Sequence, residues 1–167
     1  MQHISENLVS LRAKVAEAAE QAGRSPEEIR ILAISKTFPA ESVRLAAAAG
    51  QVQFGENRIQ EARTKIPEVN LPDLEWHMVG HLQSNKVRLA VQLFEVIQSV
   101  DSERIARKID QVCSEQDKIQ SIFIQVNVGD EIQKAGVPVE KVAELVEIVD
   151  ELPHLSLQGL MAIPPYD

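Results

Sequence analysis

The sequence predicts an α/β fold assembled from parallel βα units. Six short apolar segments alternate with longer segments whose apolar residues recur every three or four positions, the spacing of amphipathic helices. No hairpin signal separates neighbouring apolar segments, which favours parallel strands wound in one sense. A (β/α)8 TIM-type barrel and an open doubly wound sheet both satisfy this pattern. No Gly-x-Gly-x-x-Gly follows a predicted strand, which argues against a dinucleotide-binding sheet.

The predicted elements follow one another in regular order. An amphipathic helix over residues 4–23 opens the chain, and Ser25 with Pro26 predicts a short capped turn before the first strand. The predicted strands are 31–34, 52–55, 76–80, 94–97, 122–126 and 155–161. The predicted helices are 39–49, 57–66 up to Pro67, one capped by Ser84 or Asn85, one capped by Asp101, and one from Pro138.

Length and composition indicate one domain without a strong attraction to polyanions. With 167 residues, 44% of them hydrophobic, the chain can bury one sizeable core but is short for two domains. A net charge of −8 disfavours nonspecific binding to nucleic acid or to an anionic membrane, because both attract dense positive charge. We therefore expect residues 1–167 to be a single domain with neither partner.

The sequence also predicts a cytoplasmic location. No uninterrupted apolar run reaches the ~18 residues that a membrane-spanning helix needs. The N-terminus lacks the basic and then apolar layout of a signal peptide. The single cysteine, Cys113, cannot form an intramolecular disulfide, which agrees with a reducing compartment, and we expect it to be a semi-buried thiol.

The carboxyl ends of the predicted strands are the expected ligand site, because parallel α/β folds bind ligands there. The residues that the sequence places at these ends are Lys36, Glu56, Asn57, His81, Ser99, Asn127 and Met161. Any single polar residue at a strand end can be an ordinary solvated side chain. Together they predict where a pocket would form.

Lys36 is the lysine of greatest chemical interest. It follows the apolar run 31–34, whereas the other seven lysines lie in predicted helices, caps or loops, where a solvated surface charge is the ordinary expectation. Loss of hydration at the end of a buried strand disfavours the ammonium form, so the free amine that attacks an aldehyde becomes more available. Two interpretations stay open, a Schiff-base lysine and an ion pair with a carboxylate such as Glu56.

The histidines do not predict a metal site. His77 and His81 lie on one predicted strand, where residues four apart are separated by roughly 13 Å. That distance prevents them from sharing an ion while the strand holds, and no third cluster of metal ligands accompanies them. We expect no metal, and we expect His81 to line the mouth of the pocket.

Several motifs closely resemble the pyridoxal 5′-phosphate (PLP) homeostasis protein family, also called the YggS or PROSC family. They are ISKT at 34–37, FGEN at 54–57, EWHMVGHLQSNK at 75–86, QVN at 125–127, KAG at 134–136 and GLMAIP at 159–164. The resemblance covers nearly the whole chain in the right order. The Trp-His-x-x-Gly-His-Leu-Gln-x-Asn-Lys segment is its most specific part.

The resemblance implies a barrel like the N-terminal domain of alanine racemase, a PLP fold type III barrel, with covalently bound PLP and no established catalytic activity. By matching motif, Lys36 corresponds to the Schiff-base lysine, Asn57 to a pocket residue near the cofactor and Met161 to a residue that lines it. His81 and Ser84 match the motif at the same pocket. The implied role is to hold a reactive aldehyde cofactor in releasable form, in vitamin B6 and amino-acid homeostasis.

The chain departs from the family pattern at its end, because it stops after about the sixth predicted strand. The family continues with a Ser-x-Gly-Met-Ser stretch and an Arg-x-Gly segment that hold the phosphate and the ring. We therefore expect an incomplete barrel with two unpaired sheet edges that binds PLP more weakly than a full-length relative. A complete barrel would be expected to be a monomer, and protein partners are not indicated by the sequence.

Two other functions stay open alongside a noncatalytic PLP carrier. A PLP-dependent amino-acid racemase-like enzyme would need a second acid or base that faces the substrate across the cofactor ring. An interaction module that has lost cofactor binding would instead lack a reducible PLP adduct.

Overall fold

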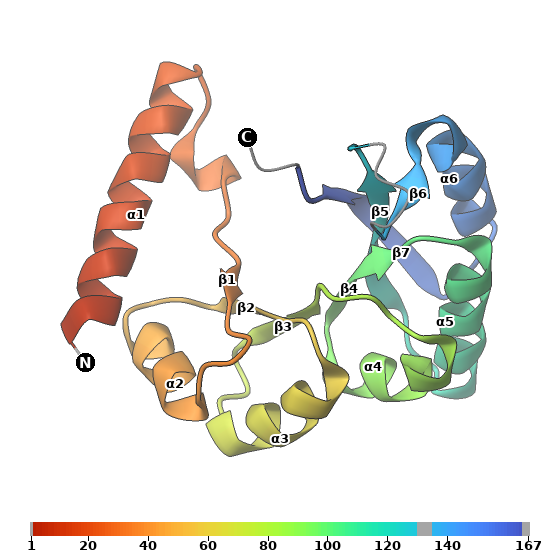
Figure 1. The fold of residues 1–167 in the computed structure, drawn as a ribbon, viewed down its shortest axis with the longest axis horizontal. Helices are drawn as coiled ribbons and strands as arrows, with labels where there is room; N and C mark the ends of the chain where they lie inside the picture. The colour runs from red at the N-terminus through yellow and green to blue at the C-terminus, as the bar shows by residue number, and fades with distance from the viewer. Residues whose placement is uncertain (1, 130–134, 165–167) are drawn as a thin grey trace.

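A curved parallel sheet runs through the protein, and the structure, a computed structural model, describes residues 2–129 and 135–164 of the chain (Figure 1). Its strands are β1 (Ala33–Ile34), β2 (Gln53–Glu56), β3 (Glu75–Met78), β4 (Val96–Val100), β5 (Gln120–Asn127), β6 (Val137–Pro138) and β7 (Leu155–Ala162). Strands β1 to β5 pair in sequence order, and β5 also pairs with β6 and β7. Every pairing is parallel.

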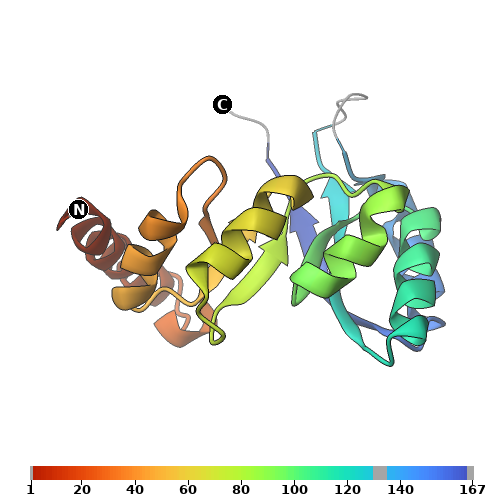
Figure 2. The same cartoon turned by 90° about the horizontal axis from the view of Figure 1, so that it is seen from below.

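Helices cover the outer side of this sheet. They are α1 (Gln2–Gln21), α2 (Ala40–Ala48), α3 (Ile59–Val69), α4 (Val87–Leu93), α5 (Glu103–Glu115) and α6 (Val142–Asp150), with short 3₁₀ turns at Pro26–Glu28, Ser84–Lys86 and Val139–Lys141. Helices α2 to α6 contact one another in order along the convex face (Figure 1), and Figure 2 shows α3 and α4 in front of the strands that they cover. The α/β architecture of parallel βα units predicted from the sequence is confirmed.

The main core lies between the sheet and these helices. Phe54, Met78, Ile97 and Ile122 are each fully buried strand residues of this layer. Burying one such side chain contributes about 1.5–3 kcal/mol relative to leaving it exposed. The ring of Phe54 also packs against Trp76 with 5.6 Å between the ring centroids, so Trp76 is a core residue.

The opposite, concave face of the sheet carries the alternate strand residues, polar and apolar, because successive side chains point to opposite faces. Gln53, Glu75, His77, Gln98 and Ser121 line a hollow of about 560 Å³ on this face. Among the described residues, β1 pairs with β2 alone and β7 pairs with β5 alone. The sheet therefore forms an open arc with β1 and β7 at its edges (Figure 1).

The structure differs from the sequence-based expectations in several local details. Strand β1 is two residues long, shorter than the predicted run 31–34. Helix α3 continues through Pro67 to Val69 and ends at Asn70, which has the left-handed backbone conformation. Helix α5 is preceded by Ser102 in place of Asp101, and neither Ser102 nor Ser25 forms a side-chain capping bond. The two-residue strand β6 was not predicted.

Candidate functional site

The expected site residues all lie at the carboxyl ends of parallel strands. Lys36 follows β1, Asn57 follows β2 directly, and His81 lies shortly after β3. Asn127 is the last residue of β5, and Met161 is the next-to-last residue of β7. Because all these strands are parallel, their carboxyl ends meet at one rim of the sheet. The rim predicted from the sequence is thus present, although Lys134 lies outside the described residues.

A small pocket of about 180 Å³ brings three of these residues together. Asn57, His81 and Asn127 line it, and Gln125 also contributes. Lys36 and Met161 do not line this pocket, although Met161 is the pairing partner of Gln125 in the register of β5 and β7. The pocket therefore joins the ends of β2, β3 and β5.

A glycine allows the loops after β2 and β3 to approach each other at this pocket. A β-carbon added to Gly80 would lie 2.1 Å from the carbonyl oxygen of Asn57 and 2.8 Å from its Cα. These atoms belong to the backbone and cannot rotate away. Any side chain at position 80 would therefore displace Asn57 from its place in the pocket wall.

Lys36 does not have the buried surroundings that the sequence predicted. Its side chain is exposed, and Ile34 before it is 43% exposed. Lys36 forms no hydrogen bond or ion pair within the described part of the chain. The expectation that Lys36 ends a buried strand is wrong for this structure, because β1 is short and lies at the sheet edge.

The carboxylate considered as a partner of Lys36 is bound by another lysine. Glu56 is fully buried, and its Oε1 lies 2.7 Å from Nζ of Lys65, which reaches in from α3. Lys65 is 6% exposed, so the expectation of a solvated charge was wrong for this lysine. The same Nζ also lies 2.7 Å from Oε1 of Glu61, and it donates to the backbone oxygen of Ser35 at 2.7 Å.

The charges of this cluster affect one another. The hydrogen bond from Lys65 lowers the pKa of the Glu61 carboxyl, and the backbone N–H of Thr37 adds to the effect. Burial opposes this lowering but is outweighed. Glu61 therefore stays ionised to a lower pH than an isolated glutamate would.

The position of Lys65 on the apolar stripe of its helix is a sequence signal for this cluster, which periodicity alone does not interpret. Within α3, the buried residues Ile59, Ala62 and Val69 mark the inward stripe, and Lys65 falls on that stripe. A lysine on an inward stripe, four residues after Glu61 and close in sequence to Glu56, indicates a buried ion pair.

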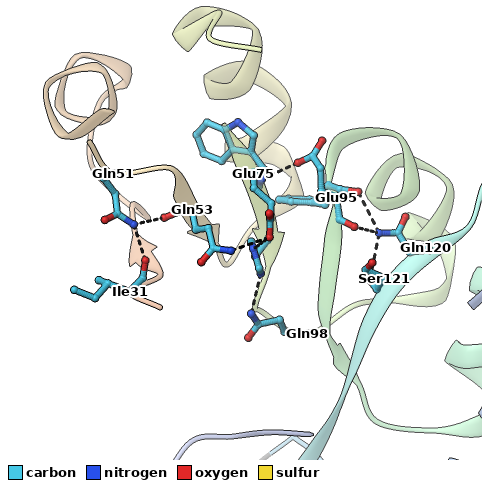
Figure 3. A network of polar contacts seen from close by, with 11 residues as sticks. Ile31, Gln51, Gln53, Glu75, Glu95, Gln98, Gln120 and Ser121 are labelled. Atoms are coloured by element: carbon cyan, nitrogen blue, oxygen red, sulfur yellow. Dashed lines mark hydrogen bonds and ion pairs between the residues drawn. The ribbon is translucent and has the colours of Figure 1, made fainter. Parts of the chain in front are cut away.

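A second polar network lies on the concave face, nearer the amino ends of the strands (Figure 3). Nε2 of His77 lies 2.7 Å from Oε1 of Glu75, and Nε2 of Gln98 lies 2.8 Å from Nδ1 of His77. Gln53 donates to the same Glu75 oxygen at 3.0 Å. Burial lowers the pKa of His77, although Glu75 and then Glu95 act to raise it. A neutral His77 that donates from Nε2 and accepts at Nδ1 satisfies both neighbours.

His81 lies at the mouth of the pocket. Its side chain is 59% exposed, and Nδ1 lies 3.6 Å from Oδ2 of Asp101. Within residues 2–129 and 135–164, no group of three or more His, Cys, Asp or Glu side chains is arranged to hold a metal ion. Over the same residues, no helix is long and apolar enough to cross a membrane.

The fold and the rim define a class of protein. The profile of the alanine racemase N-terminal domain matches residues 7–166. Alanine racemase of Clostridium difficile has the same fold over 81% of this chain, with a TM-score of 0.65 and 16% identity. The chain is therefore an alanine racemase N-terminal-like domain, whose solved neighbours are barrels of the PLP-dependent fold type III.

Closer relatives show the family. The pyridoxal phosphate homeostasis protein of Escherichia coli K12 is 44% identical over 167 residues, which cover 98% of this chain and 71% of the relative. The protein of the same name from Pseudomonas aeruginosa is 43% identical with the same coverage. PipY of Synechococcus elongatus, solved with PLP bound, has a TM-score of 0.85 and 38% identity over 98% of this chain and 72% of its own. This chain belongs to the pyridoxal phosphate homeostasis protein family.

Proposed function

We propose that this protein binds PLP at the rim of its sheet and holds it covalently through Lys36. PLP supplies an aldehyde carbon that condenses with a primary amine to form a carbon–nitrogen double bond, with release of water. The protein supplies the amine of Lys36 and, at the same rim of the sheet, the pocket lined by Asn57, His81 and Asn127. Its role is to carry the cofactor in releasable form and so to act in vitamin B6 and amino-acid homeostasis.

The observation that carries this proposal is that the side chain of Lys36 is exposed and unpaired among the described residues, on a backbone whose neighbouring residues are held by hydrogen bonds. Its side chain is exposed at the carboxyl end of β1 and is bonded to no other described residue, so its amine is available to a ligand. Its neighbours are fixed, because Lys65 binds the backbone oxygen of Ser35 and Glu61 binds the backbone N–H of Thr37. PipY, at 38% identity, has been solved with PLP bound.

The remaining rim residues fit the polar parts of such a cofactor. Asn57 and His81 line the 180 Å³ pocket with N–H groups that can donate to ring or phosphate oxygens. Met161, paired in register with Gln125 of the pocket wall, is proposed to supply an apolar contact to the ring. We assign cofactor binding to Lys36, Asn57, His81 and Met161, and no catalytic residue.

A carrier is favoured over a racemase-like enzyme by the pattern of similarity. Relatives with 37–44% identity over nearly the whole chain bear the homeostasis name, whereas alanine racemases match at 12–16% identity, a likeness of fold alone. We propose that the protein acts in the cytoplasm on a small-molecule cofactor, with neither nucleic acid nor membrane as partner. The net charge of −8 agrees with this assignment.

The test is chemical trapping of the adduct. The protein is mixed with PLP, reduced with borohydride, digested and mapped by mass spectrometry. A pyridoxyl group on the peptide that contains Lys36 supports the proposal. Either no covalent adduct, or an adduct spread evenly over the exposed lysines, would refute it.

A further inference from the structure

We infer that Glu61, Lys65 and Glu56 form a buried charge clamp that positions Lys36 by fixing the residues on either side of it. This inference rests on the proposed function, because it concerns how the amine of Lys36 is presented to the aldehyde. The clamp residues are positioning residues. None of them lines the rim pocket itself.

The clamp is centred on the ammonium of Lys65. Its Nζ has three acceptors at 2.7 Å, namely Oε1 of Glu56, Oε1 of Glu61 and the backbone oxygen of Ser35. An ammonium has three donors, so all of its hydrogen-bonding capacity is used. Charge-assisted bonds of this kind are stronger than neutral ones, and burial shields them from water. Lys65 therefore ties α3 to the end of β1.

The residue before Lys36 is held at three of its atoms. The N–H of Ser35 donates to the backbone oxygen of Gly55 at 2.9 Å, and its hydroxyl donates to Oε1 of Glu56 at 2.6 Å. Its carbonyl accepts from Lys65. Ser35 is itself buried, which leaves its side chain little freedom to find other partners.

The residue after Lys36 is held in an unfavourable backbone conformation. Thr37 has φ of +66°, the left-handed region that β-branched residues rarely adopt. Its N–H donates to Oε1 of Glu61 at 2.7 Å, the same oxygen that accepts from Lys65. The clamp thus supplies a bond that helps to hold the turn in which Lys36 lies. The N–H of Phe38 also donates to the backbone oxygen of Ser35 at 3.1 Å, so loss of Glu61 would leave the turn held by that backbone bond and by Lys65 alone.

The consequence for Lys36 follows from the contrast between its backbone and its side chain. Both neighbours are fixed, while the side chain of Lys36 itself has no partner among the described residues. A lysine side chain on a fixed base reaches a smaller volume than one on a mobile loop, so its amine meets a bound aldehyde more often in a reactive geometry. Loosening the base should slow condensation and speed release of the cofactor.

Substitution of Glu61 tests the clamp without removing a fully buried side chain. Its side chain is 27% exposed, whereas Glu56 is fully buried. Glu61→Ala removes the acceptor of the Thr37 N–H but leaves the buried pair of Lys65 and Glu56 intact. Glu61→Gln keeps an oxygen acceptor at the same place. The matched control is Glu103→Ala, which also removes a first-turn glutamate with an i, i+4 cationic partner, Arg107 on α5.

The experiment measures two quantities on the wild type and these three variants. The first is amide hydrogen exchange at Thr37 in protein without PLP, which reports the Glu61 bond directly. The second is the rate of PLP condensation, with the adduct mapped to Lys36 after reduction. Glu61→Ala should speed exchange at Thr37 and slow condensation roughly tenfold or more. Glu61→Gln should restore most of the protection of the Thr37 amide and most of the condensation rate. Glu103→Ala should change neither the exchange rate nor the condensation rate.

The outcomes separate the clamp from the proposed function. A wild type that forms no adduct at Lys36 refutes the proposed function, and the clamp with it. A wild type that forms the adduct, with Glu61→Ala reacting at the same rate, overturns the clamp alone. Equal slowing in Glu61→Ala and Glu103→Ala also overturns it, because the effect would not be specific to the residues around Lys36.

Discussion

The backbone oxygen of Asn57 occupies the space that a side chain on Gly80 would need, because a β-carbon there would lie 2.1 Å from it. Gly80→Ala should therefore push the loops after β2 and β3 apart. Overpacking of this kind costs about 1–3 kcal/mol of stability. The change should also weaken PLP binding, since Asn57 lines the rim pocket. Urea unfolding and a PLP titration measure the two effects.

Gly55→Ala is the matched control for Gly80→Ala. Gly55 also lies near the end of a strand, and an added β-carbon would lie 2.6 Å from a side-chain atom, Cδ1 of Ile34. That side chain is 43% exposed and can move aside. We expect a smaller loss of stability and of PLP affinity for Gly55→Ala. Equal losses in the two variants would contradict the assignment of Asn57 to the site.

The rim was predictable from sequence because it depends on two local facts. Apolar runs mark the strands, and parallel pairing places the residue after each run at the same edge. These two facts alone are enough to predict that Asn57 and Asn127 lie at the rim. Strand β6 has no such signal, since two residues carry no periodicity. The sequence predicts that the helix ends at Pro67, but α3 continues two residues beyond it to Val69, and Pro67 is the one residue of its last turn that cannot donate a backbone hydrogen bond.

Lys36→Ala should abolish the borohydride-reducible PLP adduct and its visible absorbance. The fold should be unaffected, because the side chain of Lys36 is exposed and contributes no hydrogen bond or ion pair to the described residues. Mass mapping after reduction detects the adduct, and circular dichroism checks the fold.

Lys86→Ala is the control for Lys36→Ala. Lys86 also follows a strand at the rim side, in the 3₁₀ turn Ser84–Lys86, and it is half-buried. We expect the adduct to persist in this variant. A pyridoxyl group found chiefly on Lys86, or one that remains at full yield in Lys36→Ala, would show that the assignment is wrong. Lys134→Ala should likewise retain the adduct, although Lys134 lies outside the described residues.

The burial of Lys65 shows what the sequence could not reveal. Composition and periodicity assign a lysine on a helix to solvent, and eight lysines look alike by that measure. The difference arises from tertiary structure, because α3 packs so that Lys65 meets a carboxylate of β2 and the backbone after β1. The surroundings of Lys36 were mispredicted for the same reason. A strand at a sheet edge does not bury its end.

Lys65→Met should be strongly destabilising. It leaves the Glu56 carboxylate buried, and Oε2 of Glu56 already lacks a hydrogen bond within the described residues. Breaking a buried pair by removal of one partner typically costs about 3–5 kcal/mol. Denaturant unfolding of the variant measures the loss.

The double variant Lys65→Met with Glu56→Gln should recover part of that stability, because it leaves no unpaired buried charge. Arg107→Met, which breaks the exposed pair with Glu103, is the control and should cost at most about 1 kcal/mol. Equal losses for Lys65→Met and Arg107→Met would contradict a buried ion pair in solution.

His77 should make the protein less stable as the pH falls through mildly acidic values. Burial lowers the pKa of His77 in the folded state, so the unfolded chain binds this proton first as the pH drops below about 6.5. The stability that His77 contributes is therefore complete above that value and is lost on acidification toward the lower folded pKa.

His77→Gln removes the titrating group but keeps an amide that can donate toward Glu75, so the pH dependence of the unfolding free energy between pH 5 and 7 should flatten. A His77→Gln slope as steep as that of the wild type, or a wild type that gains stability on acidification in this range, would show that His77 is not held neutral between Glu75 and Gln98.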